Sequence, residues 1–194
     1  MSRFIHLHTH SHYSFLEALP KVPDLVKATL ANNMDALGIT DAGNIHGAIE
    51  FYKLAEKKKI KAIIGVDTYV APRTRHDKDP IADTKRTRLV LLAENNEGYK
   101  NLLKIISASH IEGFFEKPRV DRDLLREHKE GLIAIIPSFA GDVAKLLQVG
   151  DENGAAASLA EYISIFGKEN LFLEITHHPK ARGHEDRMKR IIEI

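Results

Sequence analysis

The sequence contains no cysteine, which excludes disulfide bonds and thiolate metal sites. It has no apolar run of about 18 residues, so we expect no membrane-spanning segment, and its first residues lack the apolar core of a secretion signal. It also lacks an excess of either charge, because the formal net charge is +1. We therefore expect a soluble, cytoplasmic protein whose overall field favours neither a nucleic acid nor a membrane as a partner.

The length of 194 residues favours a single domain with a substantial core. Short apolar segments alternate with amphipathic ones, which is typical of an α/β fold. The predicted strands are Phe4–His8, Ala36–Thr40, Lys61–Val66, Leu89–Ala93, Leu132–Ile136 and Leu171–Ile175. The predicted helices are Pro23–Asn32, His46–Lys58, Glu97–Ser109, Gly141–Gln148 and Ala155–Phe166. Repeated strand–helix units follow from this order.

Two of these strands, 61–66 and 89–93, are apolar on both faces, which favours parallel strands that are covered on both sides. Polar residues follow several strand ends. A barrel gathers all such ends on one rim, whereas a doubly wound sheet gathers only those at its switch point. The pattern therefore predicts a barrel. Because no further strand precedes Ile194, we expect the barrel to be open.

Four histidines stand at alternate positions near the start of the sequence, namely His6, His8, His10 and His12. In an extended strand, residues two apart point to the same face, so a strand here would align all four imidazoles. Such imidazoles can close on one metal ion. The alternative is a polar strand end whose histidines are solvated or hydrogen-bonded.

The segment 72–86 is rich in charged residues and proline and shows no periodicity. We predict an exposed loop. Its basic side chains outnumber its acidic ones, so a phosphate-contacting patch is the alternative to a simply solvated loop.

The stretch HLHTHSHYSFLEA (6–18) resembles the first motif of the polymerase-and-histidinol-phosphatase (PHP) domain, in the form found at the N-terminus of bacterial replicative DNA polymerase III alpha subunits. Similar segments follow in the same order at 36–71, 89–105, 112–135 and 170–191. The resemblance implies that residues 1–194 form a single PHP domain. The implied fold is a distorted TIM-like (β/α)7 barrel, incomplete at its C-terminus because the last metal-binding motif would lie beyond Ile194.

In intact members, the resemblance implies a trinuclear metal site on the barrel rim that hydrolyses phosphoesters. His8 and His10 match the family's first ligand pair. Glu17 stands where the family usually has aspartate, and Asp67 where it usually has glutamate. The resemblance therefore implies that these four residues can still hold one divalent ion, zinc or manganese.

Three positions depart further from the family's ligands. Ala42 replaces a histidine, Arg88 replaces another, and Ser138 replaces a cysteine or histidine. Arginine is a permanent cation that cannot ligate a metal, and serine is a poor ligand for a borderline one. We expect Arg88 to neutralise Asp67 or Glu17 by an ion pair instead, and at least one metal position to be lost.

Other residues of the motifs are expected to support the rim without binding metal: His6, His12, Asp41 and His178. The leading interpretation is the PHP domain of a DNA polymerase III alpha subunit, mainly structural and with a degenerate phosphoesterase site. Its implied partners are the rest of that subunit, primer–template DNA reached through it, and other replisome subunits. The polymerase reaction would use Mg²⁺ in a domain outside this chain. The alternative is a free-standing, metal-dependent PHP phosphoesterase of the histidinol-phosphatase type.

Overall fold

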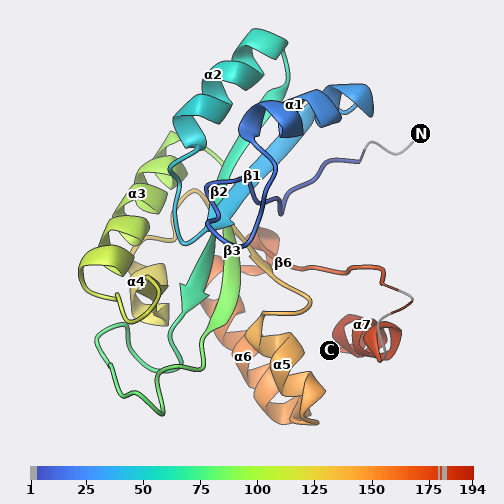
Figure 1. The fold of residues 1–194 in the computed structure, drawn as a ribbon. Coiled ribbons are helices and arrows are strands. Elements are labelled where there is room, and N and C mark those ends of the chain that lie inside the picture. The colour runs from blue at the N-terminus through green and yellow to red at the C-terminus, as the bar shows by residue number, and fades with distance from the viewer. Residues whose placement is uncertain (1–3, 179, 181–182) are drawn as a thin grey trace.

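The structure is a computed structural model that describes residues 4–178, 180 and 183–194. Its strands form one mixed sheet (Figure 1) and are β1 Ala36–Ala42, β2 Lys61–Val70, β3 Thr87–Ala93, β4 Arg119–Val120, β5 Leu132–Ile136 and β6 Leu171–Leu173. The helices are α1 Val22–Ala31, α2 Ala48–Lys58, α3 Asn96–Ile111, α4 Arg122–Glu127, α5 Asp142–Gln148, α6 Glu152–Phe166 and α7 His184–Glu193, with a 3₁₀ turn at Lys168–Asn170.

The sheet runs in the order β1-β2-β3-β5-β6, and β4 pairs with the end of β2 that lies beyond β1. β1 and β2 are parallel, as are β5 and β6, whereas β3 is antiparallel to both of its neighbours. As a result, the carboxyl ends of β1, β2, β5 and β6 and the start of β3 lie along one edge of the sheet. We call this edge the rim.

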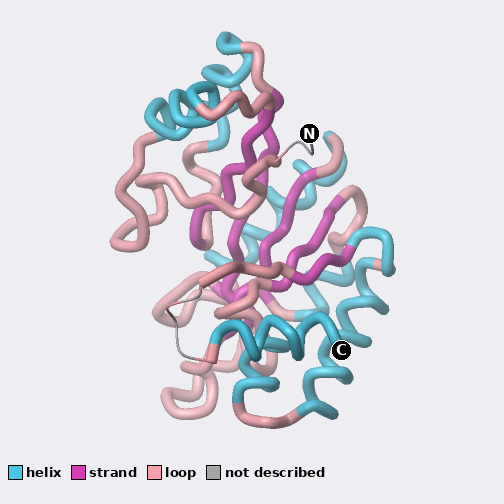
Figure 2. The backbone as a smooth tube through the Cα atoms, turned by 90° about the vertical axis from the view of Figure 1, so that its right-hand side faces the viewer, coloured by secondary structure: helices cyan, strands magenta, loops and turns pink. Residues whose placement is uncertain are grey.

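Helices α3 to α6 cover one face of the sheet, and the chain's main apolar core lies between these helices and the sheet, whereas α7 packs on α5 (Figure 1). A second cluster joins α1 and α2 to β1. The other face carries a small apolar cluster around Val90, Leu92 and Ile135. The N-terminal segment 4–8 lies across that face (Figure 2). A hollow of about 710 Å³ is lined by this segment, by β6 and by parts of the strands between them. The fold is thus α/β, with a sheet that curls towards a barrel and, over the described residues, leaves β1 and β6 unpaired with each other.

Five of the six predicted strands and all five predicted helices are confirmed, with ends shifted by a few residues. Local capping explains several helix starts. The side chain of Asn95 accepts a hydrogen bond from the Gly98 amide at the start of α3, and Asp121 accepts one from the Leu124 amide at the start of α4. None of the helices in the described part of the chain is both long and apolar enough to cross a bilayer.

The prediction of parallel pairing was wrong for β3. This strand is antiparallel to β2 and β5, and residues 71–86 join it to β2 without a helix. Its apolar character on both faces has another cause: Leu89 and Leu91 face the main core, while Val90 and Leu92 face the hollow. Burial on both faces produces this composition whichever way the neighbouring strands run.

The predicted strand Phe4–His8 is also wrong, because no strand is formed within residues 4–12. The segment does lie beside β1, since the Gly38 amide donates to His6 O at 2.7 Å and the Thr40 amide donates to Thr9 O at 2.9 Å. Between these two hydrogen bonds, the N-terminal segment contains three residue steps (6 to 9) and β1 contains two (38 to 40). The extra residue breaks the strict alternation on which the alignment of four histidines depended.

The charged segment 72–86 wraps around the fully buried side chain of Arg119. The guanidinium donates to the main-chain oxygens of Gly113, Arg75, Asp77 and Asp83 at 2.6 to 3.2 Å. Asp83 is buried too, and it receives two hydrogen bonds from Arg73 at 3.0 and 2.6 Å. The segment is therefore an ordered loop that is organised from inside by one cation.

We expect Arg119→Met to lower the free energy of unfolding by about 3 kcal/mol or more, because four main-chain carbonyl groups, two of them buried, lose their donor. Urea denaturation measures the change. The matched control is Arg126→Met, whose half-exposed side chain pairs with Asp123 on the surface and should cost less than about 0.5 kcal/mol. Equal effects of the two substitutions would show that Arg119 does not organise the loop.

Candidate metal centre

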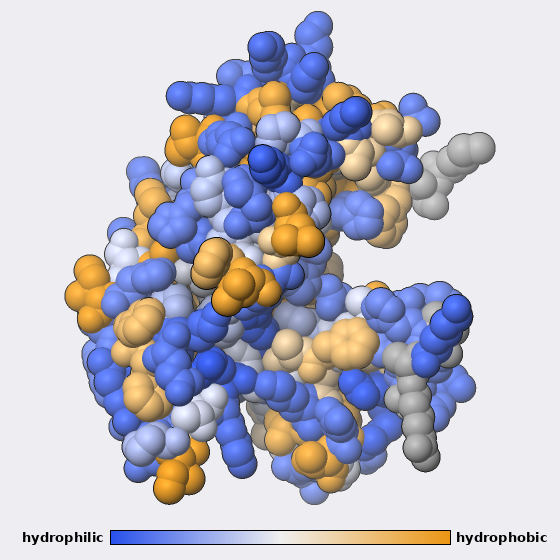
Figure 3. Space-filling model, viewed as in Figure 1, coloured by the Kyte–Doolittle hydropathy of each residue, from blue (hydrophilic) through white to orange (hydrophobic). Residues whose placement is uncertain are grey.

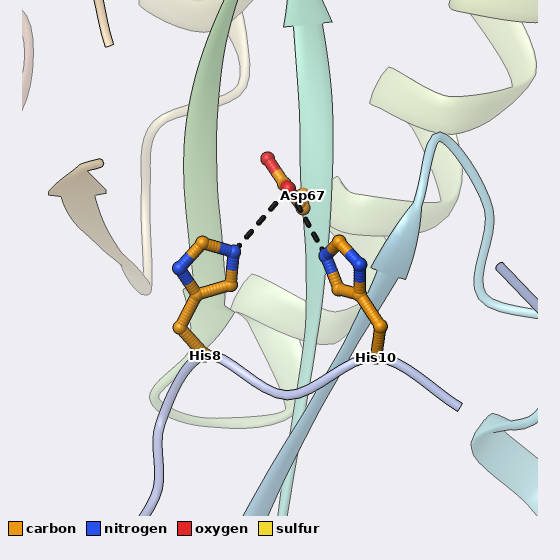
Figure 4. A group of neighbouring side chains, drawn as sticks. All are labelled: His8, His10 and Asp67. Carbon is orange, nitrogen blue, oxygen red and sulfur yellow. Dashed lines mark hydrogen bonds and ion pairs between the residues drawn. The ribbon is translucent and has the colours of Figure 1, made fainter. Parts of the chain in front are cut away.

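Three side chains bring possible metal-ligating atoms together at the rim (Figure 4). His8 and His10 come from the N-terminal segment and Asp67 from β2, and their donor atoms lie within 4.8 Å of one another. The Nε2 atoms of His8 and His10 are 3.3 and 3.1 Å from Asp67 Oδ2. A hollow of about 350 Å³ opens beside them, lined by Pro137, Phe139 and other rim residues.

Asp67 is the buried centre of this group, and only 3% of its side chain is exposed. Burial alone would raise the pKa of its carboxyl. The hydrogen bonds from His10 and His8 and the charge of Arg88 outweigh that effect and hold the pKa well below its usual range. The carboxylate is therefore ionised at neutral pH. Its Oδ1 atom is buried and has no hydrogen-bond partner among the residues that the structure describes.

Arg88 stands at the start of β3 and points into the group. Its guanidinium approaches Asp67 Oδ2 at 2.8 Å and Glu17 Oε2 at 2.9 Å, and it lies 4.3 Å from the centre of the Tyr69 ring. The cross-strand pairing of Tyr69 with Arg88 places ring and guanidinium together. Burial would lower the pKa of Arg88, but the charge of Asp67 more than reverses this effect and raises it. An ion pair of Arg88 with Asp67 or Glu17 was predicted, and the structure contains both.

Glu17 lies on the far side of Arg88 and outside the three-residue group. Tyr69 Oη donates to Glu17 Oε1 at 2.6 Å, and Lys117 Nζ approaches the same oxygen at 3.7 Å. Burial and the hydrogen bond to Glu17 raise the pKa of Tyr69 to about 12. Glu17 thus serves as the counter-ion of Arg88.

His8 is held between two carboxylates. Its Nε2 faces Asp67, and its Nδ1 lies 2.7 Å from Glu174 Oε1. Both ring nitrogens donate only when the imidazole is protonated. Burial alone would lower the pKa of His8, but the hydrogen bonds to Asp67 and Glu174 raise it to about 9. Without a metal ion, His8 is therefore a cation at neutral pH.

Glu174 was not among the predicted site residues. It follows β6 directly, and its Oε2 accepts hydrogen bonds from the Ser138 amide at 3.0 Å and from Ser138 Oγ at 3.2 Å. Ser138 Oγ also lies 2.8 Å from Thr176 Oγ1, and Thr176 O accepts a hydrogen bond from Nε2 of the buried His184 at 2.9 Å. The sequence does contain a signal for Glu174, a single carboxylate within the otherwise apolar predicted strand 171–175.

Ala42, the last residue of β1, is paired with Asp67 in the sheet. Neighbouring residues of paired strands project to the same face, so a longer side chain here would meet the carboxylate. The preceding residue, Asp41, is buried and points elsewhere. It accepts hydrogen bonds from the Ser11 amide at 2.7 Å, Ser11 Oγ at 2.8 Å and Ser14 Oγ at 2.6 Å. Asp41 therefore fixes the loop that follows the histidines.

The remaining histidines of the predicted site lie apart from the three-residue group. His6 is exposed, and its ring meets the edge of Phe4 at 4.8 Å. His12 packs on Tyr13 with ring centres 4.3 Å apart. His178 is exposed and contacts the rings of Phe139 and His184. Of the four alternating histidines, only His8 and His10 converge.

The donor set fits one metal ion and not a cluster. Two imidazole nitrogens and a carboxylate are the protein ligands of an open tetrahedral site, and Glu174 on His8 Nδ1 matches the carboxylate that orients such a histidine. Asp67 Oδ1, which has no partner within the described part of the chain, is a further acceptor. Arg88, however, already contacts Asp67 Oδ2, so any ion binds in competition with a fixed cation.

Comparison with known proteins gives one consistent family. Residues 6–178 match the PHP domain family. The chain is 40% identical over 176 residues to the DNA polymerase III subunit alpha of Treponema pallidum, covering 90% of this chain and 15% of that protein. It is 41% identical over 184 residues to the same subunit of Deinococcus radiodurans, covering 91% of this chain and 14% of that protein. The chain thus spans about a seventh of the length of these relatives.

A solved structure has the same fold. A protein from Bifidobacterium adolescentis, described as a metal-dependent phosphoesterase, superposes with a TM-score of 0.57 over 97% of this chain and 82% of its own. The sequences are 11% identical, so this likeness concerns the fold alone. It agrees with the distorted, barrel-like sheet.

The raised pKa of His8 predicts how stability depends on pH in a chelator-containing buffer. Relative to the ordinary value of 6.5, the ionic contacts of His8 stabilise the fold fully below about pH 6.5 and are lost as the pH rises through about 9, an effect of at most about 3 kcal/mol. Urea denaturation of the wild type and of His8→Gln should therefore show a stability difference that shrinks between pH 6 and 9.5.

The control is His177→Gln, since His177 is exposed and its Nδ1 lies 3.1 Å from Glu185 Oε1, so that its loss should have little effect at any pH. A difference between wild type and His8→Gln that stays constant from pH 6 to 9.5 would contradict the assigned charge of His8.

Proposed function

The chain belongs to the PHP domain family, and on this premise we propose that it is the PHP domain of a replicative DNA polymerase III alpha subunit. Within that subunit its role is mainly structural, and its metal site is degenerate. The relatives that match over some 90% of this chain carry that name. The chain itself is about a seventh of their length, so the polymerase reaction belongs to the parts beyond it.

The observation that carries the proposal is the position of Arg88. Its guanidinium lies 2.8 Å from Asp67 and 2.9 Å from Glu17, so it supplies the positive charge that these carboxylates would otherwise take from metal ions. A multi-metal hydrolase needs several ions held close together to activate water and clamp a phosphate. Ala42 and Arg88 remove two ligands at this point, which supports loss of that chemistry.

A single divalent ion remains compatible with the site. His8, His10 and Asp67 would hold it, and their mixed nitrogen and oxygen donors suit zinc or manganese. When bound, such an ion would supply Lewis acidity towards a phosphate oxygen. The chain's own residues orient the ligands: Glu174 fixes the ring of His8, and Ser138 fixes Glu174. Binding requires His8 to lose a proton and Arg88 to move.

The proposed partners follow from the same assignment. They are the remainder of the alpha subunit, primer–template DNA held by it, and other replisome subunits, in the cytoplasm. The polymerase domain of that subunit would use Mg²⁺. This chain has a net charge of +1, which supports indirect contact with DNA through the parent protein.

The second candidate is a free-standing, metal-dependent PHP phosphoesterase. The three-residue group, which could hold a metal ion, favours it. Against it stand Arg88 within the site and the long polymerase relatives. The two candidates differ in the number of metal ions bound and in hydrolytic activity.

We expect the full-length protein to bind at most one zinc or manganese ion in this domain and to show no metal-dependent removal of primer 3′ nucleotides. Elemental analysis after dialysis and a 3′-exonuclease assay with polymerase activity blocked measure these properties. The control is His8→Ala/His10→Ala, which should match the wild type in the nuclease assay. Two or more ions per domain, together with nuclease or phosphomonoesterase activity that this double variant loses, would overturn the proposal.

Placing histidine at the two departed ligand positions should strengthen the binding of zinc to this domain. We expect Ala42→His/Arg88→His to bind zinc at least tenfold more tightly than the wild type, because it adds two imidazoles and removes the competing cation. Titration calorimetry at pH 8 measures the affinity. Arg86→His, which alters a neighbouring arginine paired with Glu116, is the control. Unchanged affinity in the double variant would show that Arg88 does not occupy the metal position.

A further inference from the structure

A continuous line of hydrogen bonds runs from the first residue of α7 to the candidate metal centre. His184 Nε2 lies 3.2 Å from Thr176 Oγ1, which lies 2.8 Å from Ser138 Oγ. Ser138 Oγ donates to Glu174 Oε2 at 3.2 Å, and Glu174 Oε1 lies 2.7 Å from His8 Nδ1. We call His184, Thr176, Ser138 and Glu174 the positioning chain. Its far end is a helix that contributes no atom to the three-residue group.

The donors of the positioning chain all point towards Glu174. A carboxylate can only accept, and this one accepts from the Ser138 amide, from the Ser138 hydroxyl and from His8 Nδ1. Because the Ser138 hydroxyl gives its one proton to Glu174, it accepts from the Thr176 hydroxyl. The Thr176 hydroxyl has then given its own proton away, so it accepts from His184 Nε2. Each group thus sets the direction of the next.

His184 is held in a way that fits this direction. The residue is 1% exposed, and its ring stacks on Phe139 with ring centres 4.7 Å apart. Its Nε2 also lies 2.9 Å from Thr176 O, a main-chain oxygen that can only accept. Its Nδ1 is buried and has no hydrogen-bond partner within the described part of the chain. The ring therefore carries a proton on Nε2 and donates it to Thr176.

The positioning chain begins far from the residue that it orients. In the view of Figures 1 and 3, α7 and the N-terminal segment lie on opposite sides of a notch in the right-hand side of the molecule. Glu174 and Thr176, which follow β6, and Ser138, which follows β5, carry the connection between them. The carboxylate of Glu174 is thus fixed from the side of α7 and holds His8 on the side of the N-terminal segment.

We propose that Thr176 and His184 are positioning residues for the metal centre. Through the positioning chain they fix the carboxylate of Glu174, which in turn holds the ring of His8. This inference rests on the proposed function, in which one ion binds at the three-residue group. Outer partners of a ligating histidine set the orientation of its ring. A ring that is already fixed loses less side-chain freedom when the ion binds.

The first test removes one hydroxyl group from the middle of the positioning chain. Thr176→Val deletes it, whereas the matched control Thr176→Ser keeps it, and both retain the main-chain oxygen that His184 contacts. Zinc is titrated into the full-length wild type and both variants at pH 8. We expect the affinity for zinc to fall about tenfold in Thr176→Val and by less than about twofold in Thr176→Ser. Equal affinities of the two variants would overturn the positioning role of Thr176.

Cobalt(II) reports the geometry of the ligands directly, because its absorption bands depend on how the donor atoms are arranged. His184→Phe keeps a ring against Phe139 but removes the Nε2 donor, whereas His184→Gln keeps an amide donor. We expect the bands of bound Co²⁺ to shift in His184→Phe and in Thr176→Val but not in His184→Gln. A purely structural role of His184 would leave the spectrum of every variant that folds and binds Co²⁺ unchanged, and that result would overturn the proposal.

A measurement without metal separates this inference from the proposed function. Urea denaturation in a chelator-containing buffer gives the effect of Thr176→Val on the equilibrium constant of unfolding in three backgrounds: wild type, His8→Ala and His10→Ala. His8 contacts Glu174, whereas His10 contacts Asp67. The effect of Thr176→Val should therefore shrink at least about threefold in His8→Ala and stay the same in His10→Ala.

The outcomes of this last measurement differ for the two proposals. An effect of Thr176→Val that is the same in all three backgrounds, or that shrinks equally in both alanine variants, would overturn the positioning role. A wild type that binds neither zinc nor Co²⁺, but whose unfolding shows coupling between Thr176 and His8 alone, would overturn the single-ion site and support the orientation of His8 through the positioning chain.

Discussion

A buried carboxylate has to be neutralised where it lies, and the rim of this protein is organised around that requirement at Asp67. One carboxylate oxygen contacts His8, His10 and Arg88. These three residues come from the N-terminal segment and from β3, so their attraction to Asp67 ties both to β2. Desolvation of the charge is tolerable only because all three partners are in place. The packing of the hollow face therefore depends on electrostatics as much as on apolar contact.

Much of the fold could be predicted from the sequence, because hydrophobic periodicity reports burial directly. The element β5 at Leu132–Ile136 has the predicted bounds. Strand direction could not be predicted in the same way: β3 is buried on both faces, as a parallel strand would be, yet it is antiparallel. The short strand β4, of two residues, carries too little pattern to detect. The extra residue that shifts the N-terminal segment against β1 has no local signal either.

The contacts of the site could be predicted better from the chemical types of its residues than from the strand geometry expected for the N-terminal histidines. An arginine at position 88 pointed to an ion pair with Asp67 or Glu17, and both pairs are present. The hydrogen bond between Glu174 and His8 could not be predicted, because it depends on the close approach of β6 to the N-terminal segment, 166 residues earlier in the chain. The same limit applies to Arg119. Charge counts cannot tell which basic residue of a loop region is turned inside to bind carbonyl oxygens.

The pairing of Arg88 with Asp67 also couples the evolution of two positions. A histidine at 42 alone would add a ligand beside a site whose cation is already fixed. A histidine at 88 alone would remove that cation and leave Asp67 buried with weaker compensation, while Glu17 would lose its main partner. The charges of Arg88 and Asp67 therefore constrain each other, because a change at either position alone leaves a largely buried charge of the other residue with weaker compensation.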